Sequence, residues 1–214
     1  MMKKLFWQDP YLTHLDTMIA SVNGCDVTVA QTIFYAFSGG QESDVGSIGG
    51  REVRQARKEG KEIIYTLDEG HGLAVGDTVP MLIDWERRYR LMRLHFAAEI
   101  VLELCYRRFN AIQKIGAHIA QDKSRIDFEW VDNLASALPS LQAHANALIR
   151  EDRPITSAFS DEANERRYWE IEGFARVACG GTHLKQTGEV GAIRLKRRNV
   201  GKGKERIEIF LDAD

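Results

Sequence analysis

The amino-acid sequence predicts an α+β protein in two parts, a small β-barrel over residues 1–84 and an α+β domain over residues 85–214. Three observations support this prediction. Short apolar runs broken by glycine and polar turns fill the first part, as is typical of strands. A stretch without glycine or proline then begins after Trp85, with apolar residues at helical spacing. Strand-like segments and a second helical pattern follow, so we expect a long helix against an antiparallel sheet.

Composition and charge describe an ordinary globular protein. Of the 214 residues 44% are hydrophobic, which is enough to bury a core, and the formal net charge of −2 excludes a general polycation that would bind any nucleic acid. The three scattered cysteines, Cys25, Cys105 and Cys179, argue against a disulfide framework. No run of about 18 apolar residues occurs. We therefore expect a cytoplasmic protein with neither a membrane nor DNA as its partner.

The first part contains several short strand patterns and one glycine-rich segment. The expected strands cover residues 27–30, 32–35, 62–67 and 79–83, and their spacing suggests a small barrel. The glycine-rich segment, residues 38–46, is either a surface loop or a loop whose backbone N–H groups approach a ligand. Gln41 within it offers both a donor and an acceptor. The segment matches neither a Walker loop nor a dinucleotide fingerprint.

The second part opens with an amphipathic helix of about six turns, expected over residues 86–109. His95 and Glu99 lie four residues apart on it, so their side chains share one face. This is the spacing of a metal-binding pair, although an isolated histidine near a solvent-facing glutamate has the same spacing.

The remaining elements are expected in the following order. A hairpin covers 117–120 and 125–130, a helix 134–150, a strand 154–159, a short helix 161–166, a strand 173–178, and a closing antiparallel pair 188–196 and 205–211 around a basic loop.

The strand over 173–178 leads into Cys-Gly-Gly-Thr-His at residues 179–183. Zinc accepts cysteine sulfur and histidine nitrogen in one tetrahedral shell, and the two glycines allow Cys179 and His183 to turn toward one point. Alone, this spacing is also that of a buried cysteine beside a surface histidine. Together with His95 and Glu99 it suggests a second half of a metal site.

Several motifs occur together along almost the whole chain. They are Asp-Pro-Tyr-Leu at 9–12, Thr-Ile-Phe-Tyr at 32–35, Ser-Gly-Gly-Gln at 38–41, Asp-Val-Gly at 44–46, His95, Cys-Gly-Gly-Thr-His at 179–183 and Thr-Gly-Glu-Val-Gly at 187–191. In this order they resemble the freestanding alanyl-tRNA editing proteins, which are related to the editing domain of alanyl-tRNA synthetase and more distantly to that of threonyl-tRNA synthetase. The two-part length is similar to the medium-sized members.

The resemblance implies a trans-editing hydrolase that deacylates mischarged Ser-tRNA(Ala), and in some members Gly-tRNA(Ala), with a zinc-assisted water. It implies zinc ligands at His95, Glu99, Cys179 and His183. Thr32 would bind the serine hydroxyl, and Gly39, Gly40 and Gln41 would line the same pocket. The catalytic residues would then be Glu99, Thr32 and Gln41, and the partner the acceptor end of tRNA(Ala).

Two departures from the family pattern occur. Ala36 and Glu42 replace prolines, which only loosens the loop. Glu99 replaces the second histidine of the helix, and three readings follow. Glu99 is the fourth ligand, or it is a general base beside a site of three ligands, or the site has lost its metal and activity. The alternative function is therefore a noncatalytic, zinc-stabilised module that binds tRNA or another partner.

Basic residues cluster beside both halves of the expected site. They are Arg87, Arg88, Arg90 and Arg93 before His95, and Lys196, Arg197, Arg198, Lys202 and Lys204 in the basic loop. Such groups would hold the phosphates of the tRNA acceptor end. The sequence leaves the oligomeric state open.

Overall fold

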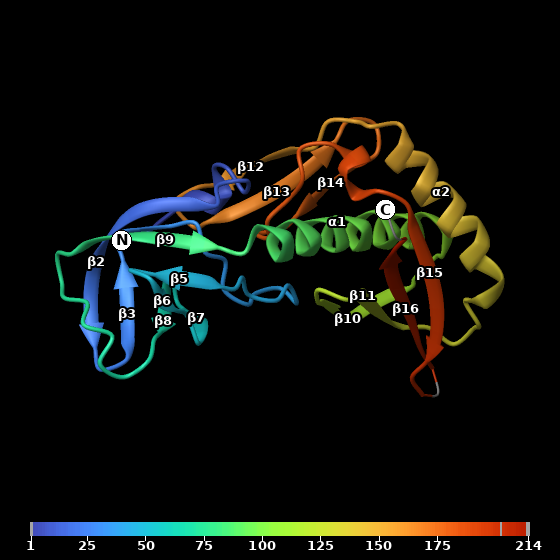
Figure 1. Ribbon diagram of the computed structural model, residues 1–214. Coiled ribbons are helices and arrows are strands. Elements are labelled where there is room, and N and C mark those ends of the chain that lie inside the picture. The colour runs from blue at the N-terminus through green and yellow to red at the C-terminus, as the bar shows by residue number, and fades with distance from the viewer. Residues whose placement is uncertain (1, 202, 213–214) are drawn as a thin grey trace. The chain divides into compact units, whose positions relative to one another are not determined.

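The computed structural model describes residues 2–201 and 203–212 and has an α+β architecture with two α-helices in that part of the chain (Figure 1). Lys202 of the basic loop lies outside the described residues. Two compact units are present, Met1–Ser38 with Glu42–Tyr89, and Gly39–Gln41 with Arg90–Asp214. The expected boundary between residues 84 and 85 lies close to the end of the first unit, and its status as a domain boundary stays a prediction.

The first unit contains a seven-stranded antiparallel sheet with the order β6-β5-β9-β2-β3-β8-β7. Its strands are β2 (His14–Asn23), β3 (Asp26–Val29), β5 (Gly46–Ile48), β6 (Arg51–Glu52), β7 (Gln55–Glu59), β8 (Glu62–Thr66) and β9 (Thr78–Ile83). Strict alternation in β9 buries Val79, Met81 and Ile83 on one face, as a half-buried strand requires. A parallel pair, β1 (Lys3–Lys4) with β4 (Gln31–Thr32), and a 3-10 helix, η1 (Leu5–Trp7), complete the unit.

The expected barrel stays a prediction, because the pairings among the described residues leave β6 and β7 as the two ends of the sheet. The expected strand over residues 32–35 is wrong beyond Thr32. Ile33, Phe34 and Tyr35 continue into the core without pairing to a strand, since they pack among buried apolar side chains of the sheet.

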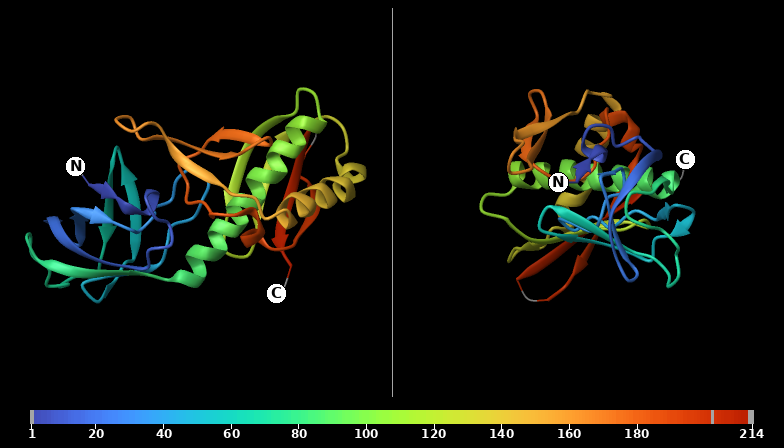
Figure 2. Two further views of the ribbon diagram at one scale, coloured as in Figure 1. Left: turned by 90° about the horizontal axis from the view of Figure 1, so that it is seen from above. Right: turned by 90° about the vertical axis from the view of Figure 1, so that its left-hand side faces the viewer.

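The second unit is built around α1 (Trp85–Arg108), the helix expected over residues 86–109, of which residues 90–108 belong to this unit. A four-stranded antiparallel sheet lies on one side of the helix and a three-stranded antiparallel sheet on the other (Figures 1 and 2). Ser124 donates to the carbonyl of Leu94 over 3.0 Å from the first sheet, and the ring of Trp169 contacts that of Phe96 from the second. The expected packing of a long helix against an antiparallel sheet is confirmed.

The four-stranded sheet has the order β10-β11-β16-β15, and the three-stranded sheet the order β12-β13-β14. The strands are β10 (Gln113–Ile119), β11 (Ser124–Glu129), β12 (Thr156–Asp161), β13 (Arg166–Ile171), β14 (Ala175–Ala178), β15 (Ile193–Asn199) and β16 (Lys204–Leu211). The second helix, α2 (Leu138–Arg150), packs on β15, where Gln142 and Asn146 accept hydrogen bonds from backbone N–H groups of that strand. The 3-10 helices η2 (Ala135–Ala137) and η3 (Thr187–Val190) complete the unit.

The short helix expected over residues 161–166 is wrong. Residues 162–165 form the tight turn between β12 and β13, in which Glu165 has a positive φ of 55° and Asn164 hydrogen-bonds to Asp161. The few hydrogen bonds of so short a helix would not offset the free-energy cost of helix nucleation. The turn instead joins β12 to β13, which carries the buried Trp169.

Candidate metal centre

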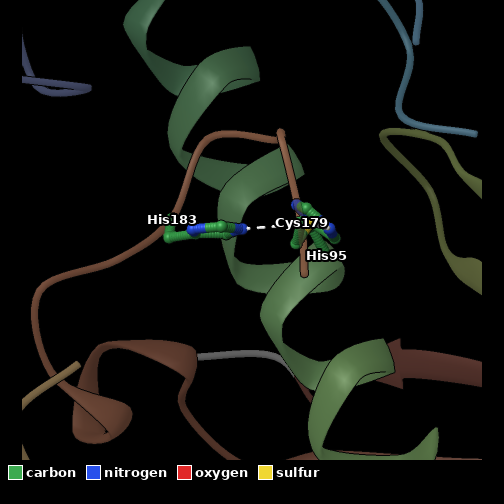
Figure 3. A group of neighbouring side chains, drawn as sticks. All are labelled: His95, Cys179 and His183. Atoms are coloured by element: carbon green, nitrogen blue, oxygen red, sulfur yellow. Dashed lines mark hydrogen bonds between the residues drawn. The ribbon is translucent and has the colours of Figure 1, made fainter. Parts of the chain in front are cut away.

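Three donor side chains converge in the second unit. His95 lies on α1, Cys179 directly follows β14, and His183 ends the glycine turn, so that residues from two distant segments face one point (Figure 3). The Cys179 sulfur lies 3.5 Å from Nε2 of His95 and 3.2 Å from Nε2 of His183. All three donor atoms lie within 4.8 Å of one another. These are three of the four residues that the sequence predicted as metal ligands, and their role as ligands stays a prediction.

Hydrogen bonds on the opposite ring nitrogens orient both imidazoles. Nδ1 of His95 lies 3.4 Å from the carbonyl oxygen of Thr182, and Nδ1 of His183 lies 2.9 Å from the hydroxyl of Ser157. A carbonyl oxygen only accepts, so the contact to Thr182 fixes a proton on Nδ1 of His95. Nε2 of each ring is thereby directed at the sulfur, which is the usual arrangement of metal-binding histidines.

The geometry of these donors fits a tetrahedral metal ion. With Zn–S near 2.3 Å and Zn–N of 2.0–2.1 Å, sulfur and nitrogen donors in one shell lie about 3.5 Å apart. The two observed separations, 3.5 and 3.2 Å, are close to that value. A thiolate with two imidazoles suits zinc and similar transition metals, whereas magnesium and calcium prefer oxygen ligands.

Glu99 lies next to this group but does not belong to it. Its Oε1 is 3.3 Å from Nε2 of His95, the same nitrogen that faces Cys179. Burial would raise the pKa of Glu99, but the hydrogen bond with His95 and the charge of that ring outweigh burial and lower the pKa to about 2. Glu99 therefore supplies a buried, ionised carboxylate at the edge of the three donors.

The two histidines have opposite electrostatic environments. Burial would lower the pKa of His95, but attraction to Cys179 and Glu99 outweighs it and raises the pKa to about 10. Burial and repulsion from His95 hold the pKa of His183 well below its usual range. The group therefore carries one positive charge, on His95, beside the ionised carboxylate of Glu99. A bound cation would replace the proton that gives His95 this charge.

Gln41 and two glycines support the turn that carries Cys179 and His183. Gln41 is 1% exposed, and its Nε2 donates to the hydroxyl of Thr182 over 2.9 Å. A Cβ on Gly181 would lie 2.2 Å from Cε1 of His95, so only glycine fits there. Gly40 has a φ of +90°, and a Cβ there would lie 2.6 Å from the carbonyl oxygen of Ala117. Gly39 also has a positive φ, but with open space around it.

Two further residues contact the candidate centre, and no sequence pattern indicated them. Ser157 on β12 pairs with His183, and Arg167 on β13, which is 5% exposed, donates to the carbonyl of Gly181 over 3.4 Å. Burial lowers the pKa of Arg167, while Cys179 opposes that shift. Both contacts depend on strand pairing in the β12-β13-β14 sheet, and only a correct pairing of those strands could have indicated them.

Thr32 lies in the first unit and is fully buried there. Its hydroxyl lies 2.6 Å from the hydroxyl of Tyr65 and accepts a hydrogen bond from the backbone N–H of Phe34 over 2.9 Å. Burial raises the pKa of Tyr65 well above its usual range, so the phenol stays protonated. The role of Thr32 in substrate binding stays a prediction.

The basic residues divide into buried and exposed groups. The expectation that Arg88 contacts RNA needs correction, because this side chain is fully buried and paired with Asp44. On the β15-β16 hairpin Lys196 and Arg198 are exposed, whereas Arg197 pairs with Glu205. Among the described residues no helix combines the length and apolar character that a membrane span needs.

Residues 168–208 match the family model described as Threonyl and Alanyl tRNA synthetase second additional domain. This segment contains Cys179 and His183.

Relatives cover almost the whole chain. It is 32% identical over 220 residues to the Alanyl-tRNA editing protein AlaX-M of Pyrococcus horikoshii, with 99% of both chains covered. It is 33% identical over 235 residues to the protein of the same description from Saccharolobus solfataricus, covering 97% of this chain and 98% of that one. The Alanine--tRNA ligase of Ignicoccus hospitalis is 33% identical over 232 residues, which are 96% of this chain and 25% of the ligase.

Proposed function

Because the chain belongs to the family of alanyl-tRNA editing proteins, we propose that it hydrolyses the ester that joins serine to tRNA(Ala), with Gly-tRNA(Ala) as a second substrate. Editing of this kind is the deacylation of a mischarged tRNA, so the chain is an aminoacyl-tRNA deacylase. The observation that carries the proposal is the convergence of His95, Cys179 and His183 on one point. We place the reaction in the cytoplasm, where it would serve translation fidelity.

We propose zinc as the metal, on the basis of the donor types and their separations. A bound zinc ion would supply a Lewis acid for the ester carbonyl or for the attacking water. His95 and His183 would bind it through Nε2, with Thr182 and Ser157 holding the opposite nitrogens. The short sulfur–nitrogen separations support Cys179 as the third ligand.

Glu99 completes this proposed site as a fourth ligand. Its ionised carboxylate already contacts Nε2 of His95, so a small side-chain movement brings an oxygen to the donor group. If instead three ligands suffice, the same carboxylate accepts a proton from the attacking water as a general base.

Recognition of the substrate is proposed for residues 39–41 and Thr32. A site that hydrogen-bonds a hydroxyl rejects an analogue lacking it far more strongly than an apolar pocket discriminates by size. The hydroxyl pair of Thr32 and Tyr65 could exchange one partner for the hydroxyl of serine. Gly39, Gly40 and Gln41 would line the pocket through backbone N–H groups and the Gln41 amide.

The acceptor end of tRNA(Ala) is the proposed RNA contact. Exposed cations of the β15-β16 hairpin, such as Lys196 and Arg198, would neutralise phosphates, while the net charge of −2 limits nonspecific binding. We propose a barrel domain over residues 1–84 and the editing domain over residues 85–214.

One assay tests the function. The full-length protein is incubated with Ser-, Gly- and Ala-tRNA(Ala), with and without a chelator, and the released amino acid is measured. We expect serine release that the chelator abolishes and zinc restores, with Ala-tRNA(Ala) largely intact.

Glu99 in place of a histidine favours a second candidate, a noncatalytic tRNA-binding module. Binding of tRNA without serine release above background would establish that candidate instead.

A further inference from the structure

Gln41 uses both ends of its side-chain amide on one residue. Nε2 donates to the hydroxyl of Thr182 over 2.9 Å, and Oε1 accepts from the backbone N–H of Thr182 over 3.4 Å. Both residues are 1% exposed, so no solvent competes for these hydrogen bonds. Thr182 directly precedes His183, and its carbonyl faces Nδ1 of His95. Gln41 is thus connected through Thr182 to both histidines.

The backbone around Gln41 is itself fixed. Gln41 forms a parallel bridge with Ile119, and the N–H of Ile119 donates to the carbonyl of Gly40 over 2.8 Å. Gly40 leaves no space for a side chain against Ala117. Gly39–Gln41 accordingly belongs to the second unit, although the chain on both sides of it belongs to the first. A side chain anchored in this way can impose a position on the turn.

The turn leaves little freedom in its packing. A Cβ on Gly181 would approach His95 to 2.2 Å and Oε1 of Gln41 to 2.9 Å, so both side chains pack closely against Gly181. A shift of this backbone would move Cys179 and His183 relative to His95. Groups that hold metal ligands in this manner commonly govern metal affinity without touching the metal.

We propose that Gln41 is a positioning residue that holds the turn between Cys179 and His183, so that both side chains face His95. This inference rests on the metal site of the proposed function, but it does not depend on deacylase activity. It gives Gln41 a role that acts through Thr182, in addition to lining a pocket.

Cobalt binding to the metal-free, full-length protein tests the proposal, because the visible absorption of Co²⁺ reports the geometry of its ligands. Gln41→Ala is expected to weaken Co²⁺ binding about 10- to 100-fold and to change the absorption spectrum. Thr182→Val should have the same effect, since it removes the hydroxyl that Gln41 holds. Thr182→Ser retains the hydroxyl, so it should bind Co²⁺ with the affinity and absorption spectrum of the wild type.

Gln142→Ala is the matched control. Gln142 lies in the same unit and accepts a hydrogen bond from the N–H of Leu195 on β15 over 2.8 Å. This variant should lose some stability and retain the wild-type cobalt affinity and spectrum. Because Gln41 and Thr182 act as one pair, the double variant should lose little more than either single variant.

Several results would overturn the proposal. One is a folded Gln41→Ala variant that keeps the wild-type cobalt affinity and spectrum. Another is a Thr182→Ser variant that binds cobalt as weakly as Thr182→Val. The third is a wild-type protein that binds no cobalt. If Gln41→Ala does not fold by circular dichroism, the comparison of Thr182→Val with Thr182→Ser decides. Wild type that binds cobalt but releases no serine refutes the deacylase and leaves this inference standing. Serine release together with unchanged cobalt binding in Gln41→Ala refutes only the inference.

Discussion

At the scale of single residues, Glu99 is the side chain on which the completion of the proposed metal site depends. Its carboxylate contacts His95 but lies outside the group whose donor atoms are all mutually close. This anion faces the positive charge of the protonated His95. A cation bound at the three donors would displace the proton of His95 and attract the same carboxylate.

We therefore expect Glu99→Gln to lower the bound zinc, because the neutral amide is a poorer metal ligand than a carboxylate. Zinc affinity should fall at least tenfold. The loss is detected as less zinc per protein chain, measured by elemental analysis after dialysis. Glu103→Gln, one turn further along α1, is the control and should keep its zinc. Full zinc content with turnover reduced about 100-fold or more would instead identify Glu99 as a general base.

Thr32→Val tests the discrimination between serine and alanine esters. We expect the ratio of kcat/KM for Ser-tRNA(Ala) over Ala-tRNA(Ala) to fall about tenfold or more, because the hydroxyl that would recognise serine is removed. The substitution also leaves the N–H of Phe34 and the hydroxyl of Tyr65 without this partner, at a cost of about 1–3 kcal/mol in folding stability.

Tyr65→Phe separates the two effects of that substitution. It removes the hydrogen bond between the hydroxyls but keeps the hydroxyl of Thr32. Stability measured by urea unfolding should fall in both variants, and discrimination only in Thr32→Val. An unchanged ratio in Thr32→Val would exclude Thr32 from substrate recognition.

The residues of the centre differ in how far the sequence could reveal them. Cys179 and His183 follow from their spacing, and His95 from a helical pattern together with the family motifs. Ser157 and Arg167 have no such local signal, since their contacts with the turn exist only after β12, β13 and β14 have paired. Side chains that orient ligands are specified by tertiary structure and not by spacing along the chain.

At the scale of elements, the turn after β14 contains two adjacent glycines with different surroundings. Gly181 faces His95 and Gln41 at distances that exclude a side chain, whereas a Cβ on Gly180 would meet no atom within 4 Å. Gly181→Ala should therefore displace His95 or the turn, reduce metal affinity at least tenfold and cost about 1–3 kcal/mol of stability.

Gly180→Ala is the control for that change and should bind metal as the wild type does. Isothermal titration with zinc and thermal unfolding measure both quantities. Equal affinities in the two alanine variants would show that the close packing at Gly181 has no influence on the ligands.

Elements with strong periodicity were predictable, and elements without it were not. The 24-residue helix α1 appears in the sequence as a long uninterrupted pattern, and its predicted bounds differ from the observed ones by one residue at each end. β2 has 10 residues, but its apolar and polar residues do not alternate regularly, and only two of its side chains are buried. The polar residues after β12 resemble a short helix until hydrogen bonding between neighbouring strands is taken into account.

At the scale of the whole molecule, a net charge of −2 must be reconciled with an RNA substrate. Exposed cations such as Lys196 and Arg198 provide a local positive surface on the β15-β16 hairpin. We expect kcat/KM for Ser-tRNA(Ala) to fall at least tenfold between about 50 and 200 mM salt, because phosphate contacts release counterions.

Lys196→Ala should weaken tRNA binding and reduce the slope of log affinity against log salt by about one. Glu170→Ala, which changes an acidic side chain on β13, serves as a charge-altering control and should not reduce that slope. A flat salt response in the wild type would exclude these cations from the RNA contact.

The assignment of Gly39–Gln41 to the second unit has a practical consequence. Protein engineers usually isolate a domain by choosing one start and one stop codon. A fragment starting at residue 85 would contain His95, Cys179 and His183. It would lack Gly39–Gln41, and with it the Gln41 amide that hydrogen-bonds to Thr182 in the turn. The second unit is therefore encoded discontinuously, and no single cut in the gene separates all of it from the first unit.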